Sequence, residues 1–390
     1  MEGTHTEHLV HRIATLRDRL DAGMDRREFL RTLATGGYAL GVAQFLGVDD
    51  FLAADDGEVP IVTAFVRSDP EDPLSLEERT RYVPAEWYAA VEKALEINEL
   101  LAQRAFTGYL GSAVVPGSYE SGSASISVGI DSGADSLRET FDGLLDGVSF
   151  NIETIVDIED LEEGPDDFDP RILGSISGGS VPGGVACETS GSIATLGPVL
   201  YDPDGDQQLF VTAEHAFEGG AEPDSDQLSL PLQEADTVEL GTVEHSHPVE
   251  DIVTVAPGGQ IEPSTALDTP SPTRVRGQLT RYGLADLIAR GENLEKVGAV
   301  TGHTTGKIQG IDAVTCFTDD FCRRGQIRWG GEMDLTDGDS GSVSYYDDPV
   351  GADEDVLVAG FNNARTWWPG QSYVWGVGAY RMTEMYGYHF

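Results

Sequence analysis

The spacing of hydrophobic and polar positions changes near residue 160 and divides the chain into two parts. In the first part, apolar residues recur at helical spacing from Pro84 to Gln103, which predicts a helix, and a second helix is expected at 136–145. The apolar runs that predict strands here are 61–66, 124–131 and 148–158. Residues 58–160 are therefore expected to form a smaller α/β domain, in which no side-chain cluster indicates chemistry of its own.

An acidic segment and a segment rich in Gly and Ser follow, and we interpret residues 161–184 as a linker. Beyond it, short apolar runs alternate with turns such as Asp202-Pro203-Asp204-Gly205. The one clear helical stretch before the C-terminus is 284–289. Many short strands at this spacing predict an all-β sandwich or barrel across residues 185–390.

The composition indicates a folded protein with a strongly acidic surface. Of the 390 residues, 40% are hydrophobic, which is enough for at least one substantial core. The 68 acidic residues outnumber the 24 basic ones and give a net charge of −44. This pattern resembles that of proteins from extreme halophiles, which stay soluble in concentrated salt, and an ordinary acidic protein is the alternative. No nucleic-acid partner is expected, because binding phosphates requires a basic face.

Residues 1–54 resemble a twin-arginine export signal. Arg26-Arg27 is followed by Phe29-Leu30 and by a weakly apolar run that ends near Ala54. That run is too polar for a membrane span. The resemblance implies a secreted or cell-surface protein that is exported in the folded state, whereas a plain cytoplasmic helix is the competing interpretation.

The chain has three cysteines, Cys187, Cys316 and Cys322. The last two enclose a short loop that a disulfide could close in an oxidising compartment, with free buried thiols as the alternative. A zinc site is disfavoured, because there is no Cys-x-x-Cys pair and the nearest histidine, His303, belongs to another motif. We expect neither a metal nor a cofactor.

The segment with the clearest chemistry is Gly338-Asp339-Ser340-Gly341. These four residues match the signature of the nucleophile loop of chymotrypsin-like serine peptidases. In such a loop, glycines permit backbone angles and a close approach that a side chain would prevent. Asp339 is expected to form a structural ion pair that shapes the loop, with a cation that the sequence does not identify.

Two upstream segments resemble the other parts of this family's catalytic triad. An apolar strand ends in Thr212-Ala213-Glu214-His215, similar to the turn that carries the catalytic histidine, although the family usually has Ala or Gly where Glu214 stands. Asp251 immediately precedes the apolar strand 252–256 and resembles the aspartate that orients the histidine, with Glu250 as its rival. The order histidine, aspartate, serine is that of the chymotrypsin-like triad.

The resemblance covers residues 174–390 and implies a double six-stranded antiparallel β-barrel, preceded here by the smaller α/β domain. It implies a serine endopeptidase that hydrolyses a peptide or protein substrate through an acyl-enzyme. Ser340 would be the nucleophile, His215 the general base and Asp251 the orienting carboxylate. The oxyanion hole would consist of the N–H groups of Gly338 and Ser340.

Further segments resemble finer features of the family. The hairpin 296–308 matches one found in bacterial and secreted members; it is read as a surface hairpin, with His303, Thr304 and Thr305 as alternative ligands. Strands at 356–361 and 373–379 would form the walls of the substrate pocket. The residues that would line this pocket are Gly360, Gly376 and, at its base, Asp334, where trypsin-like members select Arg or Lys. Asn362 or Asn363 stands where the family often has a serine that supports the aspartate.

Two alternatives to a peptidase remain open. Glu214 beside the histidine favours a non-catalytic binding module that has kept the barrel but lost turnover. In the other alternative, the α/β domain carries the function, for instance in surface attachment, and the barrel is a self-processing peptidase. The α/β domain is thus either an accessory domain or a prodomain of the kind found in many bacterial members. The oligomeric state is not predicted.

Overall fold

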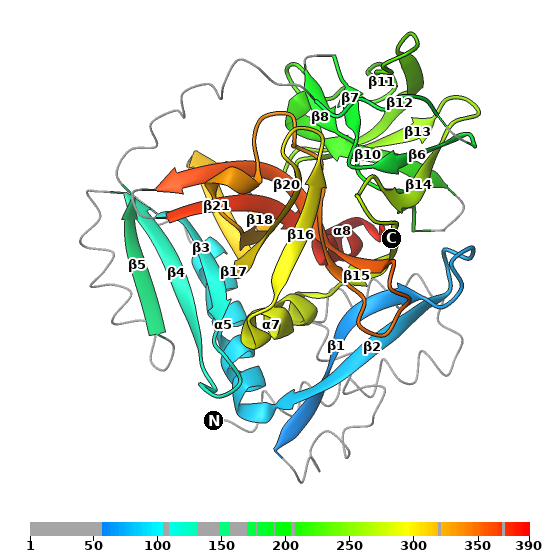
Figure 1. The fold of residues 1–390 in the computed structure, drawn as a ribbon. Coiled ribbons are helices and arrows are strands. Elements are labelled where there is room, and N and C mark those ends of the chain that lie inside the picture. The colour runs from blue at the N-terminus through cyan, green and yellow to red at the C-terminus, as the bar shows by residue number, and fades with distance from the viewer. Residues whose placement is uncertain are drawn as a thin grey trace, which may run out of the picture.

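The structure is a computed structural model that describes residues 57–103, 109–131, 149–155, 170–176, 178–190, 192–203, 207–318, 321–368 and 371–390 (Figure 1). The expected export signal at 1–54, the expected helix at 136–145 and residues 161–169 and 177 of the expected linker lie outside these residues. The described part is mainly β-strand, as predicted. Its α-helices are α5 (Ala85–Gln103), α7 (Arg281–Arg290) and α8 (Ala379–Tyr386). None of them is long and apolar enough to cross a membrane.

A first antiparallel barrel is built from the segment that follows the expected linker. Its strands are β7 (Ala186–Glu188), β8 (Ile193–Thr195), β9 (Leu200–Tyr201), β10 (Gln208–Ala213), β11 (Gln227–Leu230), β12 (Val238–His247) and β13 (Ile252–Pro257). They pair in the order β8-β7-β11-β12-β13-β10-β9. The N–H of Gly197, between β8 and β9, donates to the C=O of Val211 in β10 at 2.8 Å. This bond joins the two ends of the sheet and closes the barrel.

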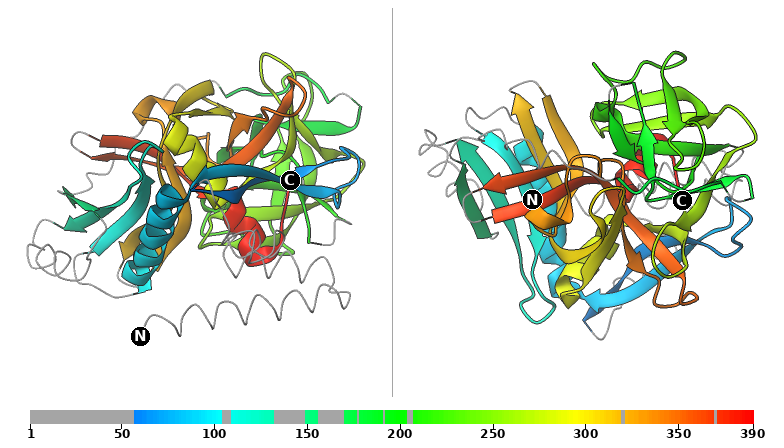
Figure 2. Two further views of the ribbon diagram at one scale, coloured as in Figure 1. Left: turned by 90° about the horizontal axis from the view of Figure 1, so that it is seen from below. Right: turned by 45° about the horizontal axis from the view of Figure 1, so that its top comes forward.

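A second antiparallel barrel consists of six strands that pair in a complete ring, β16-β17-β18-β21-β20-β19 and back to β16. Their bounds are β16 (Asn293–Gly298), β17 (Gly302–Thr318), β18 (Phe321–Trp329), β19 (Val343–Asp347), β20 (Asp355–Trp368) and β21 (Gln371–Gly378). The two barrels lie side by side in all three views (Figures 1 and 2). The prediction of a double antiparallel barrel is therefore confirmed, with the expected six strands in the second barrel but seven in the sheet of the first.

An apolar cluster fills the junction between the barrels. Leu209 and Val211 of the first barrel pack in it with Val343 and Phe361 of the second, and the C-terminal residue Phe390 belongs to the same cluster. All of these side chains are buried. Burial on this scale contributes on the order of 25 cal/mol per Å² of apolar surface and fixes the barrels against each other. A site whose residues come from both barrels can therefore be held rigidly.

The N-terminal segment does not form a sheet of its own. Its elements, besides α5, are β1 (Glu58–Arg67), β2 (Leu76–Pro84), β3 (Tyr109–Pro116), β4 (Ala124–Asp131) and β5 (Ser149–Ile155). β1 pairs with β15 (Thr273–Leu279), which itself pairs with β20, and β3 pairs with β17. Two more strands, β6 (Ser180–Gly183) and β14 (Glu262–Leu267), extend the same sheet. The segment thus reaches the second barrel on two sides, with α5 packed on β3 and β4 (Figure 1).

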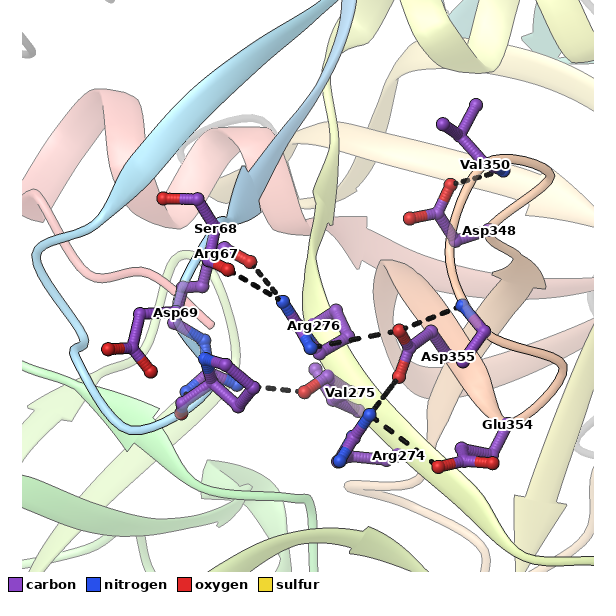
Figure 3. Close-up of polar contacts among 12 residues, drawn as sticks. Arg67, Ser68, Asp69, Arg274, Val275, Arg276, Asp348, Val350, Glu354 and Asp355 are labelled. Atoms are coloured by element: carbon purple, nitrogen blue, oxygen red, sulfur yellow. Dashed lines mark hydrogen bonds and ion pairs between the residues drawn. The ribbon is translucent and has the colours of Figure 1, made fainter.

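Polar contacts reinforce the junction where β1 ends beside β15 (Figure 3). Arg67 donates to the C=O of Val275 at 2.8 Å, and Arg276 donates to the C=O of Arg67. Arg274 and Arg276 both contact the carboxylate of Asp355 in β20, at 2.7 and 3.7 Å. These contacts link three strands, one from each of three distant stretches of the chain. The expected domain bounds of 58–160, 161–184 and 185–390 remain predictions, but one sheet of 14 strands, separate from that of the first barrel, has strands in all three ranges.

Candidate active site

His215, Asp251 and Ser340 lie together at the junction of the barrels, joined by hydrogen bonds. The Nδ1 atom of His215 is 2.7 Å from Oδ2 of Asp251, and its Nε2 atom is 2.9 Å from Oγ of Ser340. Asp251 is completely buried, whereas the His215 side chain is 41% exposed. The arrangement thus has a desolvated carboxylate at one end and a serine hydroxyl within reach of solvent at the other.

Strand register explains why His215 and Asp251 meet. β10 and β13 pair with Ala213 opposite Ile252, so the residues just beyond this pair, at the strand ends, lie next to each other. The backbone N–H of His215 also donates to Oδ1 of Asp251 at 2.9 Å. Asp251 adopts a left-handed backbone conformation, with φ of 58°, that is uncommon outside glycine. The surrounding bonds hold it there and aim its carboxylate at the imidazole. Its rival, Glu250, instead contacts Tyr386 and Arg381.

The nucleophile loop depends on its two glycines. Gly338 and Gly341 have φ values of 87° and 92°, in the region that favours glycine. A side chain on Gly341 would also meet the C=O of Thr195 at 2.4 Å. This close approach lets the N–H of Thr195 donate to the C=O of Ser340 at 2.8 Å, which ties the loop to the first barrel.

The N–H groups expected to form the oxyanion hole belong to Gly338 and Ser340. Among the described residues, neither N–H donates a hydrogen bond, whereas the N–H of Asp339 between them donates to the C=O of Thr336. Free donors on either side of a bonded one are what an anion-binding loop requires. Their assignment to an oxyanion hole remains a prediction.

The cation that Asp339 meets is Lys296 of β16. The Nζ atom of Lys296 lies 3.1 Å from Oδ2 of Asp339, and both side chains are fully buried. The carboxylate also accepts hydrogen bonds from Thr301 and from the N–H groups of Val300 and Thr336. Burial lowers the pKa of Lys296, and the negative charge of Asp339 opposes that shift. The pair anchors the nucleophile loop on the hairpin that the sequence had singled out.

Glu214 does not disturb the histidine beside it. Its carboxylate turns away and accepts a hydrogen bond from the N–H of Ala221 at 3.2 Å. Gly220 lies so close to this carboxylate that an added Cβ would be 2.8 Å from it. The departure from the family pattern is thus accommodated by a neighbouring turn.

The two asparagines expected to support Asp251 do not do so. Asn362 accepts hydrogen bonds from the indole N–H of Trp329 and the hydroxyl of Ser344 and donates to Ser342. The side-chain amide of Asn363 is buried and has no hydrogen-bond partner among the described residues. That expectation is wrong, because both amides lie in other surroundings.

The side chain that contacts Asp251 from the second barrel is that of Arg323 in β18, not that of an asparagine. Its Nη1 atom lies 2.9 Å from Oδ2 of Asp251, and its side chain is 13% exposed. Sequence analysis missed this residue, because nothing near Arg323 in the sequence marks it as a neighbour of the aspartate.

The three residues expected to line a substrate pocket lie close to backbone groups of neighbouring segments. Asp334 accepts a hydrogen bond from the N–H of Gly331 at 2.8 Å and so caps its own short turn, η2 (Glu332–Asp334). Added Cβ atoms on Gly360 and Gly376 would meet the C=O groups of neighbouring strands at 2.3 and 2.1 Å. Arg365 donates to the C=O of Leu335 at 3.2 Å. The assignment of Asp334, Gly360 and Gly376 to a substrate pocket remains a prediction.

Cys316 and Cys322 form a disulfide, one of the two alternatives that the sequence left open, and it links β17 to β18 beside Arg323. Cys187 is a buried free thiol, and burial raises its pKa to about 12. The described residues contain no group of three or more His, Cys, Asp or Glu side chains placed to hold a metal ion. His303 pairs with Glu295 at 2.7 Å on the surface hairpin.

No protein-family model matches the chain, and no curated protein matches it. Among solved structures, the chain is similar to Nocardiopsis protease (NAPase), with 18% identity and a TM-score of 0.39 over 54% of this chain and 97% of that one. Thermobifida fusca protease A is similar as well, with 17% identity and a TM-score of 0.39 over 54% of this chain and 97% of that one. For the MamO protease domain from Magnetospirillum magneticum, the identity is 12% and the TM-score is 0.32, over 51% of this chain and 93% of that one. At these values the similarities carry no argument about activity, which has to be judged from the site itself.

Proposed function

We propose that the protein is a serine endopeptidase that acts through His215, Asp251 and Ser340. The observation that carries the proposal is the unbroken hydrogen-bonded series from the buried carboxylate of Asp251 through the imidazole to the serine hydroxyl. A neutral imidazole whose Nδ1–H donates to a carboxylate presents its Nε2 lone pair to the hydroxyl. That is the geometry a general base needs before it can take the serine proton.

In the proposed reaction, Oγ of Ser340 attacks the carbonyl carbon of a peptide bond, and its proton passes to Nε2 of His215. The negative charge that develops on the carbonyl oxygen would be stabilised by the N–H groups of Gly338 and Ser340. His215 then gives its proton to the leaving amine, and an ester to Ser340 remains. Water, deprotonated by the same imidazole, hydrolyses this ester and restores the serine.

Peptide hydrolysis tests the proposal directly. In molar salt, the wild-type protein should cleave unstructured polypeptides, and Ser340→Ala should lower the rate by at least about 10³-fold. Ser342→Ala is a matched control, because Ser342 lies two residues along the same loop but its hydroxyl is buried against Asn362. Folded wild-type protein that binds polypeptides without cleaving them would support the binding module instead.

We also propose that the protein is exported through the twin-arginine motif at Arg26-Arg27. A Cys316–Cys322 disulfide fits an oxidising compartment. Replacing both arginines with lysine should leave the protein inside the cell, and an unchanged distribution would contradict export by this route.

A further inference from the structure

Asp251 has a charged neighbour that the proposed mechanism does not use. Its Oδ1 atom accepts the backbone N–H of His215, and its Oδ2 atom faces both Nδ1 of His215 and Nη1 of Arg323. The two contacts to Oδ2, at 2.7 and 2.9 Å, are nearly equal in length. One carboxylate oxygen is therefore shared between the imidazole and a guanidinium.

The contact joins the two barrels. Asp251 lies in the turn between β12 and β13 of the first barrel, and Arg323 lies in β18 of the second. Arg323 pairs with Thr315 of β17, and the adjacent disulfide between Cys316 and Cys322 holds the ends of these strands together. The guanidinium is thus presented to Asp251 from a braced strand pair.

The energetics of burial favour such a partner. Asp251 is completely buried, and a carboxylate removed from water is costly unless hydrogen bonds and an opposite charge compensate for it. His215 in its neutral form supplies hydrogen bonds but no charge. Arg323 supplies the charge, and at 2.9 Å the interaction is a charge-assisted contact.

On the basis of the proposed function, we propose that Arg323 is a positioning residue that fixes Asp251 and sets the pH range over which His215 works as a base. The carboxylate stabilises a protonated imidazole, and a cation held on the same oxygen opposes that effect. With Arg323 in place, the imidazole stays neutral, and so able to accept the serine proton, at lower pH than it would beside an uncompensated carboxylate.

The other charged or titratable groups around His215 and Asp251 have different contacts. Glu214 binds the N–H of Ala221, Glu250 contacts Arg381 and Tyr386, Asp339 pairs with Lys296, and the neutral thiol of Cys187 contacts Thr212. His247, between Tyr386 and Tyr388, is kept neutral to about pH 4 because burial lowers its pKa. Among the described residues, Arg323 is therefore the cation that contacts the carboxylate of Asp251 directly.

The test compares pH–rate profiles of peptide hydrolysis for Arg323→Gln, Arg323→Lys and Arg324→Gln. Arg324 is the matched control, because it is the next residue of β18 and its guanidinium donates instead to the C=O of Ala102. Arg323→Gln should move the acid limb of the profile to higher pH by roughly one unit. Arg323→Lys, which keeps a cation, should move it less, and Arg324→Gln should leave it in place.

If Arg323 only stabilised the fold, its replacement would not change the pH dependence of the reaction. If Arg323→Gln lowers the rate or the melting temperature but leaves the acid limb at its wild-type pH, the proposal is overturned. If the uncharged variant does not fold, Asp251→Asn replaces it: the guanidinium NMR signals of Arg323 should then shift, and they should not shift in the control Glu250→Gln. Unchanged Arg323 signals in Asp251→Asn would overturn the proposal as well.

Failure of the peptidase proposal can be distinguished from failure of this one. The NMR signals of the His215 ring can be followed against pH in Ser340→Ala, in which no turnover is needed. If the wild type shows no hydrolysis but Arg323→Gln raises the midpoint of this titration, the peptidase proposal fails and the role of Arg323 stands. If hydrolysis occurs and the midpoint does not move, the reverse holds.

Discussion

Asp339 and Lys296 show how single side chains shape the candidate site without taking part in its chemistry. Both are fully buried, and the carboxylate gathers donors from the hairpin turn and from the nucleophile loop. A buried ion pair contributes little over an apolar replacement, but removing one partner leaves an uncompensated charge. The pair therefore makes the loop conformation costly to change.

The first prediction follows from this asymmetry. Lys296→Met should lower the free energy of unfolding by about 3–5 kcal/mol, because Asp339 is left charged and buried. Adding Asp339→Asn to it should recover a substantial part of that loss. Urea unfolding of the two single variants and the double variant measures the coupling, and additive losses would contradict a buried pair.

Glu384 gives a pH-dependent prediction. Burial raises its pKa to about 7, although Arg281 lies nearby and opposes the shift. The folded state then binds more protons than the unfolded state between about pH 4.5 and 7, so stability falls as pH rises through that window. Glu384→Gln, which resembles the protonated form, should match wild type near pH 4.5.

At pH 8 the same variant should exceed wild type by on the order of 1–3 kcal/mol in free energy of unfolding. Glu262→Gln, at an exposed position, serves as the control and should show no such trend. A difference between Glu384→Gln and wild type that is the same at both pH values would contradict the assignment.

At the scale of elements, the β17–β18 hairpin braces the site from the second barrel. Its strands are bridged by Cys316 and Cys322, and it carries Arg323 to Asp251. The crosslink closes a loop with a sequence separation of 6 residues. A loop of that length stabilises the folded protein by about 2 kcal/mol through loss of entropy in the unfolded chain.

Replacing both cysteines with serine should therefore lower the free energy of unfolding by about 2 kcal/mol and slow peptide hydrolysis, because Arg323 is then less firmly held. Chemical denaturation with and without reductant measures the first effect. Cys187→Ser separates the bridge from the free thiol. Hydrolysis that is as fast in the reduced protein as in the oxidised one would show that the brace is not needed.

Elements marked by local patterns could be predicted, and contacts between distant elements could not. The sequence indicated α5, β4 and the residues of the triad, because helical spacing, apolar runs and short motifs are local. It missed β2, an edge strand of mostly polar residues in which only Val83 is buried, and which is recognisable only through its pairing with β1. Lys296 as the partner of Asp339, and Arg323 as the partner of Asp251, depend on how the barrels and hairpins meet. Spacing along the chain carries no information about such contacts.

At the scale of the whole molecule, the N-terminal segment is part of the fold that carries the site. Trp87 and Ile126 share a buried core cluster with Ile308 and Trp329 of the second barrel. β1 and β3 also supply hydrogen bonds to β15 and β17. A chain reduced to residues 170–390 would lack β1 and β3. It would therefore expose the paired edges of β15 and β17 and the remaining half of the shared core cluster.

We therefore expect such a truncated chain, made on its own in molar salt, to lack the cooperative unfolding transition and the near-ultraviolet circular dichroism of the full chain. Mixing it with a separate peptide of residues 57–155 should restore part of both signals. A truncated chain that folds and hydrolyses peptides like the full chain would contradict this view and would favour a removable prodomain.

The central claim is that Ser340 is a nucleophile activated by His215, and covalent labelling tests it most directly. Folded protein in molar salt is treated with a fluorophosphonate, digested and analysed by mass spectrometry. The account predicts one adduct per chain, located on Ser340 and absent from His215→Ala. Folded wild-type protein that acquires no adduct on Ser340, or that is labelled equally well without His215, would contradict it.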